Sequence, residues 1–357
     1  MDKNDIMGCA MGYTTLKDVA ERAGTTASTV SYVLNQKQGR YVSEEMRRRV
    51  LEAAEELHYI KSYGASSLKG KSRRLLSILV PQFENQFFTR LIVAAEKILM
   101  LAGYDLVISN TDDNPEKEKE IIERMVGQRV DGIIVTPTTK GAENTEILRR
   151  VGLPMVVVDR PLTGVSAYHR VATDNYGFGV EAAEYLIRKG HTHIGYVNWD
   201  SEIKDLEDRH AAIVNTYRKH GFDESSVAVA CKPFSYQGGY DATKEILEDH
   251  PEVTALCYGF NMQAIGGVSY LNEKGIRVPD DVSVMLVGSP DWATIGHFCH
   301  IDMGDSAIGE RAAKVLLEEI DGKLPVDGAS CFVQNGHLVE GSSVKDIAIN
   351  SKQEEKR

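Results

Sequence analysis

The chain has 357 residues, of which 42% are hydrophobic and 26% charged, and its formal net charge is −11. These proportions exclude a disordered chain and allow two or three globular domains. No run approaches the roughly 20 apolar residues of a membrane helix, and the first 12 residues lack the apolar core of a signal peptide, so we expect a cytoplasmic protein without membrane contact.

The charge is distributed unevenly along the chain. Residues 13–74 hold 12 Lys and Arg against seven Asp and Glu, a net charge of +5, whereas residues 75–357 carry −15. Binding to a phosphate backbone requires local positive charge, and an acidic body is repelled by DNA. This asymmetry predicts that any contact with nucleic acid is confined to the first part of the chain.

Residues 13–60 follow a helical pattern in three pieces, after an arm (residues 1–12) that we expect to be disordered. Thr15 and Asp18 have the spacing of a capping box before the first helix, and Gly24 ends that helix. Apolar residues then recur at spacings of three and four, which is enough for a small core. The pattern predicts a compact all-helical domain.

Residues 61–74, KSYGASSLKGKSRR, are small, polar and basic, and we interpret them as a linker. Beyond it, apolar β-rich runs alternate with helical stretches. The predicted strands are residues 75–81, 104–110, 131–137, 154–160, 193–199, 227–231, 255–259 and 282–288. Continuous apolar strands between helices favour parallel sheets covered on both faces. Eight of them over about 280 residues predict an α/β body of two doubly wound lobes.

Ligands of such sheets bind at the carboxyl ends of the strands, between the two halves. The chain contains no P-loop, no G-x-S-x-G sequence and no ordered Ser, His and Asp set. We therefore expect neither enzymatic activity nor a cofactor. Two groups of residues have donor spacing: His191 with His193, and His297 with Cys299 and His300. They lack further ligands nearby in sequence, so we interpret them as structural rather than metal-binding.

From about residue 14 to residue 344 the chain resembles the lactose-repressor (LacI/GalR) family of bacterial transcription regulators. The resemblance rests on TTLKDVAERAGTTASTVSYVLN (14–35), VSEEMRRRVLEAAEELHY (42–59), SSLKG (66–70), VDGIIVTP (130–137), LPMVVVDR (153–160), KGHTHIGYV (189–197) and GIRVPDDVSVMLVG (275–288). It implies a helix-turn-helix DNA-binding domain (13–60), a hinge (61–74), and a periplasmic-binding-protein-like body (75–344) that binds an effector.

The resemblance assigns the DNA-contacting residues of the first domain. Ala27, Ser28 and Tyr32 match positions that contact bases in the major groove. Tyr32 stands where many members have Arg or His, which implies a different operator sequence. The polar residues that match phosphate-contacting positions are Thr15, Thr26, Thr29, Ser31 and Asn35. Capping of a helix is an equally good interpretation of Thr15 and Thr26.

In the family the hinge forms a helix when two subunits meet on DNA, and a Leu inserts into the minor groove and kinks the duplex. Leu68 is the matching residue, and Ala65 is small enough for paired hinge helices to approach each other. A palindromic operator requires a two-fold protein, so we expect a homodimer on double-stranded DNA. The polar tail (345–357) lacks the leucine heptad of the family's tetramers.

For the body, the resemblance implies lobes of residues 75–173 plus 291–304 and of residues 174–290 plus 305–344. The implied effector-binding residues are Phe87, Phe88, Asp159, Arg209, Phe234, Phe260, Asn261 and Asp291. One departure concerns the last of these, because Pro290 occupies the position where members have a ligand-binding carboxylate. Either Asp291 replaces that carboxylate, or the ligand differs.

Aromatic walls combined with Asp and Arg suit a sugar or a sugar derivative. The sequence therefore predicts an allosteric transcription repressor of carbohydrate or related metabolism, controlled by a small metabolite bound between the lobes. Two other interpretations remain open. The effector is a nucleobase or a protein partner instead of a sugar, or the chain is a solute-binding protein.

Overall fold

The computed structural model of the protein describes residues 14–35, 41–60, 72–165, 167–200, 204–325 and 328–348. The chain divides after Arg73 into two compact units. Within the described residues, no helix combines the length and the apolar character needed to cross a membrane.

The first unit, the headpiece, consists of three helices, α1 (Leu16–Ala23), α2 (Ala27–Leu34) and α3 (Glu44–Glu56). The predicted capping box is confirmed, because the hydroxyl of Thr15 accepts from the backbone N–H of Asp18, whose carboxylate accepts in return from the backbone N–H of Thr15. Apolar residues from each of the three helices pack together in one small core. The predicted arm and hinge residues 1–12 and 61–71, which include Ala65 and Leu68, lie outside the described residues.

The second unit contains two six-stranded sheets, with strand orders β11-β5-β4-β3-β1-β2 and β12-β10-β9-β8-β6-β7. Every pairing is parallel except that of β12 with β10. The strands are β1 (Leu75–Val80), β2 (Asp105–Asn110), β3 (Gly132–Val135), β4 (Met155–Val158), β5 (His169–Thr173), β6 (Ile194–Trp199), β7 (Val227–Lys232), β8 (Ala255–Tyr258), β9 (Ser283–Val287), β10 (Cys299–Asp302), β11 (Ser330–Gln334) and β12 (His337–Val339). The predicted fold class, with two doubly wound lobes, is confirmed.

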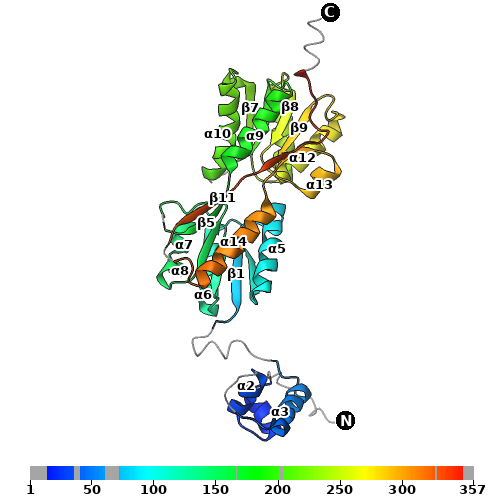
Figure 1. Ribbon diagram of the computed structural model, residues 1–357. Coiled ribbons are helices and arrows are strands. Elements are labelled where there is room, and N and C mark those ends of the chain that lie inside the picture. Colours follow the sequence, from blue (N-terminus) through cyan, green and yellow to red (C-terminus); the bar gives the residue numbers. More distant parts are fainter. Residues whose placement is uncertain are drawn as a thin grey trace, which may run out of the picture. The chain divides into compact units, whose positions relative to one another are not determined.

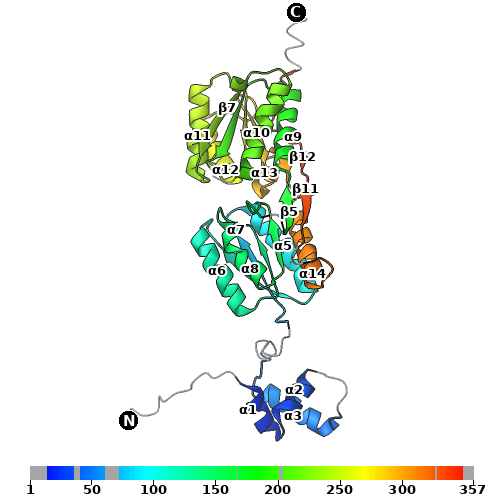
Figure 2. The same ribbon diagram turned by 90° about the vertical axis from the view of Figure 1, so that its left-hand side faces the viewer.

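Helices cover both faces of the first sheet, as Figures 1 and 2 show. On one face α5 (Gln86–Leu101) packs against α14 (Asp305–Ile320), and on the other lie α6 (Pro115–Gln128), α7 (Gly141–Asn144) and α8 (Glu146–Arg150). Burial on both faces explains why β1 is apolar almost throughout: successive residues belong to different clusters.

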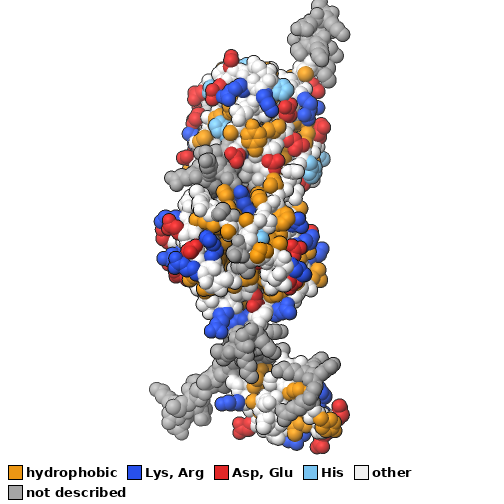
Figure 3. Space-filling model, turned by 60° about the vertical axis from the view of Figure 1, so that its left-hand side comes forward, with side chains coloured by type: hydrophobic (Ala, Val, Ile, Leu, Met, Phe, Trp, Pro, Cys, Tyr) orange, Lys and Arg blue, Asp and Glu red, His pale blue; other side chains and the backbone are white. Residues whose placement is uncertain are grey.

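The second sheet is covered in the same way. Helices α9 (Asn175–Arg188) and α10 (Lys204–Lys219) pack together on one face, and α11 (Tyr236–Asp249) and α12 (Asn261–Lys274) on the other. The short helix α13 (Asp291–Ile295) and the 3-10 turn η1 (Glu224–Ser226) complete the lobe. Acidic and basic side chains are interspersed over the face of the two lobes that Figure 3 shows.

The chain passes between the lobes three times: after β5, after β10, and between β11 and β12. Residues 291–304 therefore belong to the second lobe, and residues 305–334 return to the first, where α14 lies beside α5 (Figure 1). The predicted assignment of these two segments was wrong. Its cause is that β10 and β11 are short strands with polar residues, which do not stand out in the sequence as strands.

The beginning of the predicted polar tail also differs from expectation. The backbone N–H of Lys345 donates to the hydroxyl of Ser283 at 3.0 Å, and that of Ile347 donates to the carbonyl of Lys189 at 2.8 Å. Residues 345–348 are thus part of the second lobe.

Candidate functional site

A cavity lies between the two lobes, where the carboxyl ends of strands from both sheets face each other. Seven of the eight predicted effector residues line it: Phe87, Phe88, Asp159, Arg209, Phe234, Phe260 and Asn261. They come from loops and helix starts that are far apart in the sequence. Convergence on one cavity is what the strand-end rule for doubly wound sheets predicts.

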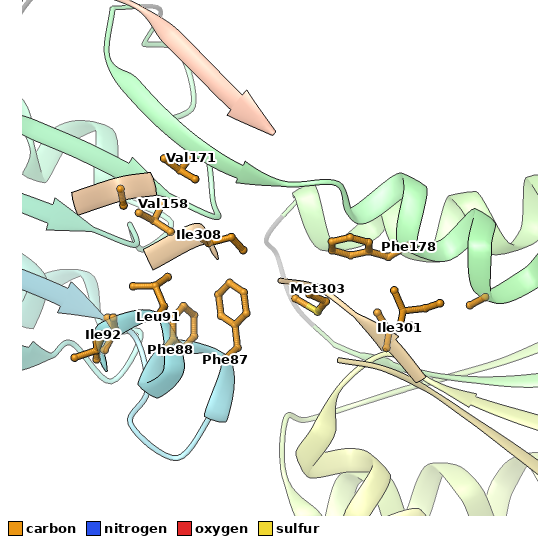
Figure 4. Packing of buried hydrophobic residues seen from close by; sticks show 14 of the residues in the cluster. Phe87, Phe88, Leu91, Ile92, Val158, Val171, Phe178, Ile301, Met303 and Ile308 are labelled. Carbon is orange, nitrogen blue, oxygen red and sulfur yellow. The ribbon is translucent and has the colours of Figure 1, made fainter. Parts of the chain in front are cut away.

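Aromatic rings form two groups in this cavity. Trp199, Phe234 and Phe260 lie at the ends of three different strands of the second lobe, and their ring centroids lie 5.4 to 6.0 Å apart in tilted or edge-to-face contact. On the first lobe, Phe87 and Phe88 meet edge to face at 4.9 Å, and Phe87 lies opposite Met303 of the second lobe (Figure 4). The cavity therefore offers flat apolar surfaces on both sides of a bound molecule.

Arg209, on α10, is a buried cation with neutral partners. Its guanidinium donates to the carbonyl of Gly259 and, at 2.5 Å, to the side-chain oxygen of Asn175, and it lies 5.0 Å from the ring centroid of Phe260. Among the residues described, no carboxylate lies within ion-pair distance of it, and its Nε has no hydrogen-bond partner. Burial lowers the pKa of Arg209. An acceptor group on a ligand would relieve this cost.

Two further charged residues line the cavity. Asp159 has a positive φ of 64°, and its carboxylate accepts from the hydroxyl of Thr173 at 2.9 Å. Arg160 is paired with Asp113 at 2.6 Å and lies over the ring of Trp199. The first lobe thus brings both an acceptor and a fixed cation to the cavity.

Asp305, at the start of α14, also lines the cavity, and sequence reasoning missed it together with Met303. Its side chain is buried, and burial raises its pKa to about 6, although the nearby guanidinium of Arg90 lowers it. Both missed residues lie where the chain passes between the lobes after β10. Because that strand was not recognised, nothing in the sequence marked its end as a strand end.

Asp291 is the predicted effector residue that the structure leaves out of the cavity. Its side chain is 73% exposed, and its carboxylate is bonded to Gln86 at 3.0 Å and to Arg90. Pro290 lines the cavity in its place. In this structure the carboxylate of Asp291 therefore points to Gln86 and Arg90, not into the cavity.

In the headpiece, the predicted DNA-contacting residues 26–29 lie at the start of α2, whereas Thr15 caps α1 and Asn35 follows the end of α2. Thr26 caps that helix, and Ser28 is exposed beside the half-buried Ala27. Thr29 is only 9% exposed and its hydroxyl lies 3.1 Å from that of Thr26, so it supports the helix start. Farther along the chain, the side chain of Asn35 donates to the carbonyl of Ser31 at 2.6 Å, and Tyr32 is half-buried. An exposed helix start is suited to approach a groove of DNA.

Two of the histidines considered as metal ligands, His191 and His300, bond to groups of the protein. One imidazole nitrogen of His191 bonds to the hydroxyl of Thr254 at 2.8 Å and the other to the carbonyl of Lys345 at 3.1 Å. His300 bonds to the carbonyl of Phe298. These contacts hold the imidazoles of His191 and His300 within the second lobe.

Two family models match the chain. The model for periplasmic binding proteins and the sugar-binding domain of the LacI family matches residues 73–331, and the model for bacterial regulatory proteins of the lacI family matches residues 15–62. Among solved structures, the lac repressor bound to ONPG is similar with a TM-score of 0.80 at 22% identity, covering 93% of this chain and 100% of that chain. A CelR regulator in complex with cellobiose is similar with a TM-score of 0.68 at 23% identity, covering 92% and 99%.

Curated relatives are similar over nearly the whole chain. The HTH-type transcriptional repressor PurR of Pasteurella multocida is 31% identical over 320 residues, 87% of this chain and 92% of the relative. The PurR of Klebsiella pneumoniae is 30% identical over 337 residues, 93% and 97% of the two chains. With a capped helix-turn-helix unit and a cavity between two doubly wound lobes, this chain belongs to the LacI family of bacterial regulatory proteins.

Proposed function

We propose that this protein is a homodimeric transcription repressor that binds a palindromic operator through its headpiece, and that a sugar or sugar derivative in the interlobe cavity controls its affinity for DNA. The observation that carries the proposal is the convergence of Phe87, Asp159, Arg209 and Phe234 on one cavity in a unit that follows a helix-turn-helix. A sugar presents an apolar face to aromatic rings and hydroxyl groups to Asp and Arg.

A nucleobase is the second candidate for the effector. The three rings of Trp199, Phe234 and Phe260 approach one another from three strand ends, and such an aromatic enclosure also suits a flat heterocycle. A screen by thermal shift separates the two classes. Sugars, sugar acids, sugar phosphates and nucleobases are each added to the protein, and a ligand at 100 times its Kd stabilises the folded state by about 2.7 kcal/mol.

The DNA-binding part is tested by gel retardation with fragments from the neighbourhood of the gene. We expect a sequence-selective shift at nanomolar protein that weakens steeply as salt rises, because phosphate contacts release counterions. A protein that gains stability from a sugar but retards none of these fragments would be a solute-binding protein, and the repressor proposal would fail.

The link between the two sites is tested with Arg209→Gln, which removes the buried cation. We expect a ligand found in the screen to lose its effect on DNA binding, while the affinity of the ligand-free protein for DNA stays the same. The control is Arg218→Gln on the same helix, since Arg218 is exposed and forms an ion pair with Glu224 at the surface. An unaltered response in Arg209→Gln would place the effector site elsewhere.

A further inference from the structure

Arg90 reaches from the first lobe to the second. It lies on α5, and its guanidinium donates to the carbonyl of Ser289 and to the carboxylate of Asp291, both in the segment between β9 and β10. The hydroxyl of Ser289 lies 3.4 Å from the same guanidinium. Because a guanidinium presents five donors in one plane, it can hold both acceptors at once.

Gln86, one helical turn earlier, bonds to the same aspartate. Its side-chain amide donates to the carboxylate of Asp291 at 3.0 Å, and its carbonyl oxygen accepts from the backbone N–H of Asp291 at 3.0 Å. We call Gln86, Arg90, Ser289 and Asp291 the interlobe clasp. Since Gln86 and Ser289 line the cavity, the clasp lies at its rim.

Arg90 forms a second, longer ion pair at the same time, with Asp305 of its own lobe. Asp305 lies 3.6 Å from the guanidinium, its side chain is 6% exposed, and one of its carboxylate oxygens is buried without a hydrogen-bond partner among the described residues. Burial raises the pKa of Asp305 to about 6, against the lowering effect of Arg90. The charge of Asp305 is therefore incompletely compensated, and a closer guanidinium would stabilise it.

We propose that Arg90 shifts between two carboxylates as the lobes move: it is shared by Asp291 of the second lobe and Asp305 of its own lobe when the cavity is closed, and it binds Asp305 alone, at closer range, when the cavity opens. Asp291 favours closure because it can hold Arg90 only across the junction. Asp305 favours opening because it competes for the same guanidinium. The carboxylate of Asp291 is 73% exposed, so solvent screens its pair with Arg90, which suits the pair to shift an equilibrium rather than to lock one state.

The inference rests on the interlobe cavity of the proposed function, but its test needs neither DNA nor a ligand. The sequence contains two tryptophans, Trp199 in the cavity and Trp292 beside Asp291. Trp292→Phe leaves Trp199 as the reporter, and quenching of its fluorescence by acrylamide measures how open the cavity is. All variants are made in this full-length background, and circular dichroism verifies that each is folded.

The two aspartates should act in opposite directions. We expect Asp291→Asn to raise the quenching constant of Trp199 by about twofold, because an exposed ion pair contributes a factor of this order. We expect Asp305→Asn to lower it, since Arg90 then has no competing carboxylate. The control Asp321→Asn removes an exposed ion pair with Lys323 just beyond the other end of α14 and should leave the constant unchanged.

The role of Arg90 itself is tested by repeating both aspartate substitutions in a chain that carries Arg90→Gln together with Trp292→Phe. With Arg90→Gln in place, neither aspartate substitution should change quenching further. Shifts of both aspartate variants in the same direction, an unchanged Asp291→Asn, or effects that persist with Arg90→Gln would each overturn the proposal. A failure of the proposed function would appear differently, as loss of DNA retardation or ligand stabilisation with the quenching results intact.

Discussion

Thr26 illustrates how one side chain can serve both the fold and the DNA contact. Its hydroxyl accepts from the backbone N–H of Thr29 and so caps α2, and its exposed position at the helix start is that of the predicted phosphate contact. The first turn of α2 contains no acidic residue. A substitution that keeps the helix cap but adds a negative charge can therefore separate the two roles.

We predict that Thr26→Asp preserves the stability of the headpiece, since Asp is a good N-cap and interacts favourably with the helix dipole. Affinity for operator DNA should fall by at least about tenfold, because the carboxylate faces phosphates. Thr26→Ser, which keeps the hydroxyl, is the control and should retain both properties. Thermal unfolding and fluorescence anisotropy measure the two effects. Equal DNA affinity for the Asp variant would leave Thr26 as a helix cap alone.

Glu319, on α14, is a buried carboxyl with one hydrogen bond. It accepts from the backbone N–H of Met155 at 3.1 Å, and its other oxygen has no partner in the part of the chain that the structure describes. Burial raises its pKa from 4.5 to about 7. A raised pKa means that the folded state binds this proton more tightly than the unfolded state. The stability that the group contributes is therefore present below pH 4.5 and lost as the pH rises to about 7.

We predict that Glu319→Gln removes this loss. The variant should be more stable than the parent by up to roughly 3 kcal/mol at pH 8, and the gap should close toward pH 4.5. The measurement is chemical denaturation at several pH values. Glu310→Gln is the control, because Glu310 is exposed on the same helix and the change in net charge is identical. A gap that does not depend on pH would contradict the assignment.

Among the elements, the α11 and α12 pair depends on close backbone approach. A Cβ on Gly266 would lie 1.8 Å from the carbonyl oxygen of Tyr236, and one on Gly239 would lie 1.9 Å from that of Gln263. Each helix thus places a glycine against the backbone of the other. The two helices are held at a distance that no other residue type permits.

We predict that Gly266→Ala destabilises the second lobe by about 1–3 kcal/mol or more, since the backbone cannot move away as a flexible side chain would. Gly127→Ala is the matched control: Gly127 is exposed on α6, and its Cβ would meet nothing within 4 Å. That change should stabilise by up to about 1 kcal/mol through helix propensity. Calorimetry on both variants measures whether the two changes in stability have opposite signs.

The elements also show what the sequence can predict. All eight strands predicted from apolar runs are present. The central strands among them, such as β3 and β4, are buried on both faces, and this burial is the reason for their consecutive apolar residues. The four strands that escaped prediction, β5, β10, β11 and β12, are short or contain charged and polar residues. Cavity residues at the ends of predicted strands were found, whereas Met303 and Asp305 were not. Side-chain pairing between lobes, as at Asp291, has no periodic signature at all.

For the whole molecule, the division after Arg73 separates a basic part of the sequence from an acidic one. The headpiece has its own apolar core, and the two lobes have theirs. Residues 13–74 carry a net charge of +5, whereas residues 75–357 carry −15. The lobes should therefore retain ligand binding when they are separated from the headpiece.

We predict that a chain beginning at Ser72 unfolds at the same temperature as the lobes of the full protein and keeps the thermal shift given by the effector. It should no longer retard operator DNA, because the helix-turn-helix is gone. Calorimetry, the ligand screen and gel retardation measure these properties. Loss of the ligand-induced shift in this fragment would show that the headpiece contributes to the cavity.

The three passages of the chain between the lobes have a consequence for how the protein folds during synthesis. The last strands, β11 and β12, complete the edges of both sheets, and β11 pairs with β5, whose residues are made about 160 positions earlier. Neither lobe can be finished until nearly the entire chain has left the ribosome, whereas the headpiece can fold after its first 60 residues. The DNA-binding unit is thus formed well before the part that regulates it.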